Sequence, residues 1–493
     1  MPARTHFLTC ALALSVVLAA GATYAQQPPP PRPAAPPAPP PGAAPAPAPP
    51  AGEAPPAEAP SPTAGGAISP PGDSRGLTTE PEDEPEDWAL LAPRSILAIP
   101  NVVLQVVFWP IQHGLRFTER HHIIEEVQDI LYNDARTAGI VPSFSFLSSQ
   151  GPTVGVQAFH DDLGGHEEKA HIDAKFGGRF TQAYEVAFEA DRFLGSPWWV
   201  ETLTRYEVQP RLLFEGYGDD APELDTGVNL GPRDGAVETK FRQRRALLLG
   251  GVGYTFGKPG SEFKLGGVGV WNSREFGETD SDDVSIEEVY DTSQLVGFSD
   301  TVKTLELGGR AILDTRDHKG ATGSGVYIEV FGGAVPRFDE YSYGHFGGEA
   351  TVYIDLFRGT RVLVLRAVNE AVGFAPDEDI PFSDLPRLGG PNRLRGFDLD
   401  RFRDRVTAVG TVEYHYPIHE YLAGALFIDA GRPAPSYEKL FEMDKWRLGG
   451  GGGFIIRSKK TVLFSLDVAY GDGINVYFTT DPLRAFSGRN EQL

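Results

Sequence analysis

The sequence is almost without cysteine, since Cys10 is the only one among 493 residues. Because Cys10 lies in a leader that we expect to be removed, the mature chain forms no disulfide, thiolate metal site or cysteine nucleophile. Basic residues are also few, 44 against 67 acidic ones, which gives a formal net charge of −23. This balance argues against a nucleic-acid partner, which requires a basic surface.

Long apolar runs and catalytic motifs are absent as well. The best candidate for a membrane-spanning helix, residues 95–110, is interrupted by Pro100 and ends at Pro110. It is therefore shorter than the roughly 18 apolar residues that such a helix needs. The motifs GxSxG and HExxH do not occur, and Gly449–Gly453 fits no phosphate-binding loop. We expect no enzyme, no cofactor and no metal site.

The N-terminal region divides into a leader and a linker. Residues 1–25 are typical of a secretory signal peptide, with Arg4 before an apolar run and Thr23 and Ala25 at the positions that precede cleavage. Residues 26–87 consist largely of proline and alanine and contain roughly half of the 42 prolines. Such a segment buries too little apolar surface to offset its ordering entropy, so we expect a disordered linker.

Residues 88–138 show a helical spacing of apolar side chains. Ile96, Ile99, Val103 and Val107 recur every three to four residues. Two interpretations remain open for this segment. The helices lie at a membrane surface from the periplasmic side, or they pack against the domain that follows.

From residue 139 to residue 486 the apolar pattern changes to a period of two. Val462, Phe464, Leu466, Val468 and Tyr470, for example, alternate with mostly polar residues. A soluble β-sandwich shares this alternation, but the signal peptide, the aromatic strands and their regular spacing favour a membrane barrel. We predict an all-β fold, a 16-stranded antiparallel transmembrane β-barrel, with residues 487–493 as a tail. Strands are expected to start near residues 139, 152, 167, 182, 198, 238, 261, 302, 324, 343, 361, 405, 421, 446, 461 and 474.

One long connection, Phe374–Asp404, carries an unusual combination of residues. Long and short connections alternate, so termini in the periplasm place this loop on the extracellular side. Gly396 permits close backbone approach, and Arg395 offers a rigid donor fork for carboxylates. In the next two strands the alternation directs Glu413 and Asp429 into the lumen. A charge-assisted lock between Arg395 and these acids is our structural hypothesis.

The same segments resemble a known family. Leu394–Phe397, Thr411–Pro417 and Gly424–Gly431 are similar to the loop tip and two barrel strands of the BamA/TamA superfamily of outer-membrane assembly proteins, also called bacterial surface antigens. The resemblance implies that the loop folds back into the lumen, where its arginine meets acids on the wall. In this interpretation Arg395, Gly396 and Phe397 form the tip. The residues assigned to loop support are Gly389, Gly390 and Pro391.

The C-terminus has the pattern of a last strand that targets a barrel to its membrane. Gly473, Val476 and Phe478 match this pattern, and Phe486 resembles the closing aromatic residue of outer-membrane barrels. The tail after Phe486 departs from the usual terminal aromatic. An ordinary amphipathic strand is the alternative interpretation.

The resemblance implies work at the bacterial outer membrane, namely insertion or translocation of outer-membrane proteins or lipids without ATP. The seam would join Val141–Ser148 to Ile474–Phe486. Candidate partners are outer-membrane lipid and lipopolysaccharide, unfolded outer-membrane proteins, and periplasmic or lipoprotein partners. Because only about 50 residues separate the linker from the first strand, we expect a short member without POTRA modules. The alternatives are a passive porin-like channel and a surface-antigen barrel without insertase activity.

Overall fold

The computed structural model describes residues 131–479, apart from 134, 136, 179–180, 219–237, 259, 319–321, 338–339, 358–360, 375–378, 419–421 and 458–461. The expected signal peptide, the linker, most of the helical segment, Phe486 and the tail lie outside these residues. Within the described part of the chain, no helix has the length and apolar character needed to cross a membrane.

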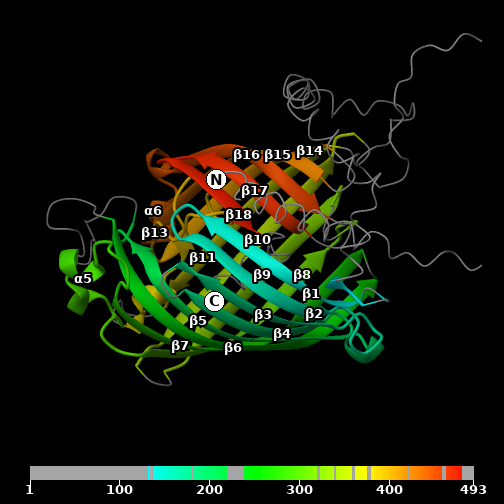
Figure 1. Cartoon of the computed structure of the whole chain (residues 1–493), viewed down its shortest axis with the longest axis horizontal. Helices are drawn as coiled ribbons and strands as arrows, with labels where there is room; N and C mark the ends of the chain where they lie inside the picture. The colour runs from blue at the N-terminus through cyan, green and yellow to red at the C-terminus, as the bar shows by residue number, and fades with distance from the viewer. Residues whose placement is uncertain are drawn as a thin grey trace, which may run out of the picture.

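The described residues form one closed antiparallel barrel, in which the first strand pairs with the last (Figure 1). Each other strand pairs with its neighbours in the chain, and β11 pairs with β14 across the long loop. The barrel strands are β1 (Ala138–Leu147), β2 (Gly151–His160), β3 (Lys169–Gly177), β4 (Gln182–Ala190), β5 (Trp198–Phe214), β6 (Thr239–Lys258), β7 (Ser261–Glu278), β8 (Val302–Asp314), β9 (Gly325–Val335), β10 (Tyr343–Asp355), β11 (Val362–Gly373), β14 (Val406–Pro417), β15 (Leu422–Ala434), β16 (Arg447–Arg457), β17 (Val462–Tyr470) and β18 (Ile474–Thr479).

The predicted 16-stranded barrel is confirmed, and every strand starts within two residues of its expected position. Two additional strands, β12 (Arg387–Leu388) and β13 (Phe402–Arg403), pair with each other inside the long loop. The sequence did not predict them, because two residues are too few to show an alternation.

Side chains alternate between an apolar outer face and a polar lumen. Ile428 is 63% exposed on the outer face, whereas its neighbour Asp429 is 1% exposed. Val412 and Glu413 show the same contrast at 51% and 2%. An apolar exterior around a polar interior is the arrangement of a barrel that spans lipid.

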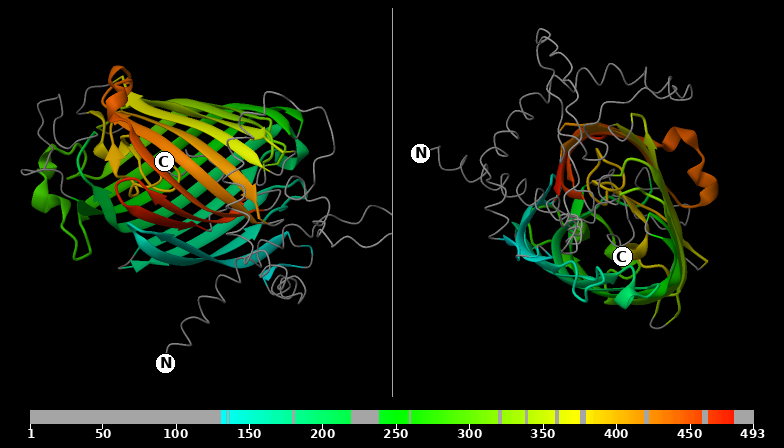
Figure 2. Two further views of the ribbon diagram at one scale, coloured as in Figure 1. Left: turned by 90° about the horizontal axis from the view of Figure 1, so that it is seen from above. Right: turned by 90° about the vertical axis from the view of Figure 1, so that its right-hand side faces the viewer.

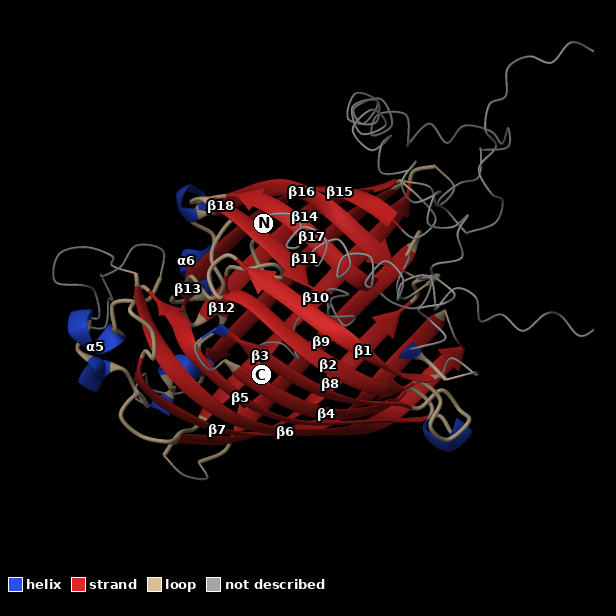
Figure 3. Cartoon of the chain, viewed as in Figure 1, coloured by secondary structure: helices blue, strands red, loops and turns tan. Residues whose placement is uncertain are grey.

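The longer connections gather at one end of the barrel, which we call the loop end (Figure 3). It carries α5 (Ile286–Val289), α6 (Tyr437–Leu440) and the 3-10 turns Thr292–Gln294, Phe382–Asp384 and Met443–Lys445, while the turn Phe193–Gly195 lies at the opposite end. A cluster of buried apolar residues packs the connection that carries α5 and the turn Phe382–Asp384 against the ends of β5 and β6. It consists of Leu212, Phe214, Phe241, Ile286, Tyr290, Leu295, Phe298 and Phe382.

Candidate functional site in the barrel lumen

The connection between β11 and β14 lies within the ring of strands (Figure 2, right). Its two short strands pair Arg387 with Arg403 and Leu388 with Phe402, which gives this lumen loop a regular base. A buried apolar cluster joins the loop to the barrel wall. It consists of Leu388, Leu394, Phe397 and Phe402 from the loop with Val368 and Val409 from β11 and β14.

Arg395 contacts both acids named from the sequence. Its Nε and Nη2 donate to the two carboxylate oxygens of Asp429 at 2.8 and 2.9 Å, and its Nη1 donates to Glu413 Oε2 at 2.7 Å. Its backbone N–H also donates to Asp429, at 3.0 Å. The guanidinium carbon lies 3.4 Å from the ring centroid of Phe427. Bidentate, buried pairing of this kind gives both strength and a fixed orientation.

The two residues after Arg395 contact the last strand. The backbone N–H of Gly396 donates to the Tyr477 hydroxyl at 3.1 Å, and that hydroxyl donates to the Phe397 carbonyl at 2.7 Å. Sequence reasoning missed Tyr477, because it assigned the neighbouring positions Val476 and Phe478 to membrane targeting. The alternation of β18 places Tyr477 on the inner face of the barrel, and this was the signal in the sequence that could have identified it.

Glycines on the wall allow the loop tip to approach the barrel backbone. A Cβ at Gly449 would lie 1.8 Å from the Arg395 carbonyl oxygen, and one at Gly471 would lie 2.6 Å from the Gly396 carbonyl oxygen. Gly396 itself has φ of +94°, which an L side chain rarely adopts. The contact between loop and wall therefore requires glycine on both sides.

Gly389 and Gly390 fold the loop against itself. Gly389 N donates to Arg393 O at 3.2 Å, and Gly390 N donates to Phe397 O at 3.0 Å. Their φ angles are +115° and +88°. Pro391 follows and lines a cavity in the lumen.

A second set of buried charges anchors the lumen loop to β11. Arg393 Nη1 donates to Glu370 Oε2 at 2.8 Å. The other oxygen of Glu370 lies 2.8 Å from His345 Nε2, and His345 Nδ1 lies 2.9 Å from Glu306. The ring of His345 thus bridges the two carboxyl groups, and when both are ionised each ring nitrogen donates to one of them. The sequence named none of these residues, since inward acids on β8 and β11 are common in any barrel.

Arg403 connects the loop to the apolar cluster at the loop end. Its guanidinium carbon lies 5.2, 5.8 and 5.7 Å from the rings of Phe214, Phe241 and Phe382, and Nη2 donates to Leu213 O at 3.0 Å. Burial lowers the pKa of Arg403 to about 10. Cation–π contacts with three rings thus surround a charge that sits among apolar side chains.

The seam between β1 and β18 closes the barrel. Within the described residues, which end at Thr479, Ser145–Leu147 pair with Tyr477–Thr479, and β1 pairs with β2 along its whole length. Val476 O accepts from Ser148 N at 3.2 Å, and the rings of Phe478 and Phe144 meet edge to face at 5.0 Å. Gly473 lies in the turn before β18, and Phe486 is outside the described residues.

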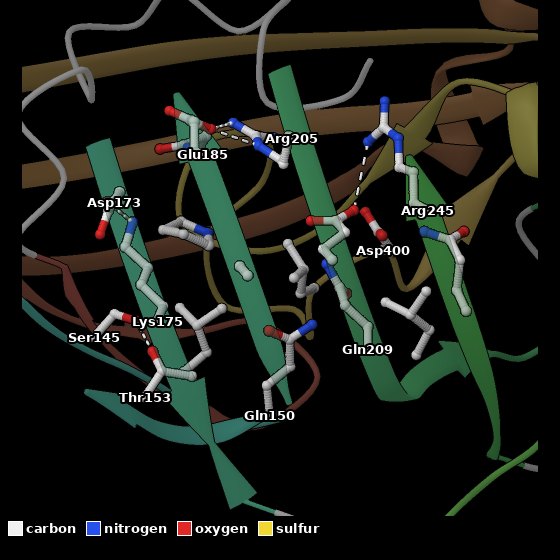
Figure 4. Close-up of a pocket in the computed structure, with 18 of the residues that line it drawn as sticks. Ser145, Gln150, Thr153, Asp173, Lys175, Glu185, Arg205, Gln209, Arg245 and Asp400 are labelled. Carbon is white, nitrogen blue, oxygen red and sulfur yellow. Dashed lines mark hydrogen bonds and ion pairs between the residues drawn. The ribbon is translucent and has the colours of Figure 1, made fainter. Parts of the chain in front are cut away.

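A cavity of about 330 Å³ remains between the lumen loop and the wall formed by β1 to β6 (Figure 4). Charges of both signs line it, including the pair of Glu185 with Arg205 at 2.5 Å and that of Asp173 with Lys175 at 3.0 Å. Ser143 and Ser145 bring the inner face of β1 to the same cavity. The described residues contain no group of three or more His, Cys, Asp or Glu side chains placed to hold a metal ion.

Comparison with known families identifies the barrel. The sequence model of the Omp85 superfamily domain matches residues 163–478, well over half of the chain. The chain belongs to the Omp85 superfamily. This is the superfamily of BamA/TamA-type barrels, as the sequence predicted, and it implies an outer-membrane location. No curated protein sequence matches the chain.

Several solved structures are similar to this Omp85 barrel. A BamA from Haemophilus ducreyi lacking POTRA domains 1–3 has 14% identity and a TM-score of 0.48, over 70% of this chain and 69% of that one. CdiB from Acinetobacter baumannii has 10% identity and a TM-score of 0.43, over 69% and 58% of the two chains. CdiB from Escherichia coli has 10% identity and a TM-score of 0.45, over 69% and 62%. The chain thus spans less than two thirds of either CdiB.

Proposed function

We propose that this Omp85 barrel assists the insertion or translocation of outer-membrane proteins or lipids through the seam between β1 and β18, without catalytic chemistry. The observation that carries the proposal is the seam itself, at which the first and last strands of the barrel pair and close it. When these two strands separate, an added strand satisfies the backbone groups of the open edge, which are costly to leave unpaired in lipid.

The lumen loop supports the same proposal. It is anchored by Arg395 and Arg393 on two sides, so it occupies space that a wide passive channel would leave open. We propose that the contacts of Arg395, Gly396 and Phe397 with Glu413 and Asp429 act as a lock, with Gly389, Gly390 and Pro391 shaping its base. Gly473, Val476 and Phe478, together with Phe486, are proposed to direct the chain to its membrane.

The remaining cavity along β1 to β6 is the observation that favours the second candidate, a narrow porin-like channel. The two functions differ in whether the seam must open. A disulfide across it, made with Ser145→Cys and Thr479→Cys, uses residues that pair directly. The expected mature chain has no other cysteine, so this bond forms without competition.

The test reconstitutes the oxidised and reduced variant in liposomes and measures the folding of a second, unfolded outer-membrane barrel. The proposal expects folding to stop on oxidation and to return on reduction. A disulfide between Ala187→Cys and Leu203→Cys, which pair across β4 and β5, is the matched control and should change nothing. Steady ion conductance that is equal in the oxidised and the reduced variant, together with no assisted folding, would establish the channel instead.

We further propose export by a signal peptide, residues 1–25, with the mature chain starting at Gln26. Outer-membrane lipid and lipopolysaccharide are the proposed surroundings, and unfolded outer-membrane proteins and periplasmic or lipoprotein components the proposed partners. N-terminal sequencing of the protein purified from outer membranes tests the cleavage site, and any start other than Gln26 contradicts it.

A further inference from the structure

The connection between β15 and β16 folds over the outside of the barrel. It carries α6, and Figure 2, right, shows this segment in orange outside the ring of strands. Leu440 of α6 is 5% exposed because it packs on Ala371, Val406 and Ala434. Each of these three residues lies an even number of positions from an exposed apolar residue of its own strand, so all three belong to the outer face.

Polar contacts hold this connection against the same face. The side chain of Arg432, an outward residue of β15, is buried; it donates to the carbonyl of Glu442 and pairs with the carboxylate of that residue at 3.2 Å. The Tyr437 hydroxyl donates to Asn369 Oδ1 at 2.7 Å, and the Tyr437 ring stacks on Phe346 with centroids 6.3 Å apart. The connection therefore has a defined position on the outer wall.

Beyond these contacts, large apolar side chains are left exposed. Phe441 and Met443 are 73% and 77% exposed, and Tyr437 is 39% exposed. Phe374, which follows β11, is 91% exposed, and its ring lies 5.5 Å from that of Phe346 on the outer wall. We call Phe374, Tyr437, Phe441 and Met443 the external patch. Exposed apolar side chains that gather in one place mark an interaction surface.

The external patch lies at the height where the edge of a membrane is expected. Val406, beneath α6, and Tyr416 share the outer face of β14 and are ten positions apart. This separation corresponds to about 33 Å along the strand and about 25 Å along the membrane normal, for a strand tilted by about 40°. The apolar band of a transmembrane barrel has this height, and aromatic girdles flank it on both sides.

The strands beneath α6 supply no aromatic ring at this edge. The outward residues of β11, β14 and β15 there are Asn369, Ala371, Val406, Ala408, Arg432 and Ala434. The rings of the external patch stand in their place, and they come from two connections instead of from the strands.

We propose that the external patch seats in the outer leaflet of the membrane, at the boundary between acyl chains and headgroups, and that Arg432 and Leu440 hold it there. The occupant of this surface is lipid, because the patch continues the lipid-facing wall on which Leu440 rests. Glu438 and Lys439 are exposed on the same short helix, so the segment is amphipathic, as segments that lie in this boundary are. The inference is independent of whether the barrel inserts proteins or conducts ions.

The test places a spin label at Phe441→Cys or Met443→Cys in the full chain, because the expected mature chain contains no other cysteine. The protein is reconstituted in liposomes of phosphatidylethanolamine and phosphatidylglycerol. The measurement is the ratio of label collisions with oxygen, which concentrates in lipid, to collisions with a water-soluble nickel chelate. Ile428→Cys on the outer face is the lipid reference, and Ser299→Cys in a connection at the loop end is the water reference. Both patch labels should exceed the water reference several-fold.

A matched pair of variants tests how the patch is held. Arg432 and Lys439 both contact the Glu442 carboxylate at 3.2 Å, but Lys439 is exposed. Arg432→Ala should lower the ratio of the label at residue 441 toward the water reference, and Lys439→Ala should leave it unchanged. Semi-native electrophoresis confirms that each variant is a folded barrel.

Three results would overturn the inference. Patch labels as accessible to nickel as Ser299→Cys would place the patch in water. Equal ratios in Arg432→Ala and Lys439→Ala would remove Arg432 as its anchor. A label that is exposed to water in liposomes and becomes immobile only when an outer-membrane protein extract is added would assign the patch to a protein partner. Failure of the assisted-folding assay would leave this inference standing, since no folding is measured here.

Discussion

The wall formed by β14 to β18 contacts the lumen loop directly, whereas the wall formed by β1 to β6 faces much of it across a cavity. On the wall formed by β14 to β18, Arg395 pairs with two buried acids, and Gly449 lets the loop backbone approach the backbone of β16. On the second wall, charged side chains such as Glu185 and Arg205 pair with each other instead. The comparison indicates that the loop tip is anchored to the last strands, while Arg403 ties the loop base to β5 and β6. None of the loop contacts described above involves β1 to β4, so these strands can separate from the loop without breaking those anchors.

The largest expected effect comes from removing the positive charge that joins the loop to the wall formed by β14 to β18. Arg395→Ala leaves Glu413 and Asp429 buried without their cation and should destabilise the barrel by about 3–5 kcal/mol. The measurement is the temperature at which the folded band is lost in semi-native electrophoresis. Arg401→Ala, which removes a more exposed arginine from the same loop, is the control and should cost far less. Equal losses in both variants would contradict the role of Arg395.

A smaller effect is expected from steric displacement of the loop tip. Gly449→Ala places a methyl group 1.8 Å from the Arg395 carbonyl oxygen, so loop or wall must shift. We expect a loss of about 1–3 kcal/mol, as for other overpacked sites, with faster protease cleavage within residues 387–403. Gly450→Ala is a matched control on the next residue, because its nearest neighbour would be 3.5 Å away. Cleavage that is as fast in Gly450→Ala would show that any substitution in this strand loosens the loop.

The smallest effect concerns the contact between the loop and the end of β5. Glu215 lies 2.5 Å from Arg401, and burial raises its pKa to about 7 against the opposing effect of Arg401. A carboxyl with a raised pKa contributes stability below its unfolded value of 4.5, and this contribution is lost as the pH rises through about 7. Protease cleavage near Arg401 should therefore rise a few-fold between about pH 5 and pH 8. Glu215→Gln should flatten this profile, and an unchanged profile would refute the assignment.

Much of the barrel was predictable because lipid imposes a strict alternation on each strand. The parity of Val412 and Ile428 was enough to direct Glu413 and Asp429 inward, and the resemblance of the loop tip supplied Arg395 as their partner. The second anchor was not predictable, since nothing in the sequence around His345 or Glu370 distinguishes them from other inward polar residues. Tyr477 was missed for a different reason, because its neighbours Val476 and Phe478 were assigned to membrane targeting although the alternation places Tyr477 on the inner face.

The sequence alone determined the number, position and orientation of the strands, because each strand carries its own period of two and needs no distant partner to show it. Only the tertiary structure decided where the loop rests, which acid pairs with Arg393 and which residues of β1 and β18 meet at the seam. Those features depend on contacts between residues that are distant in the chain, and local periodicity contains no information about such distances.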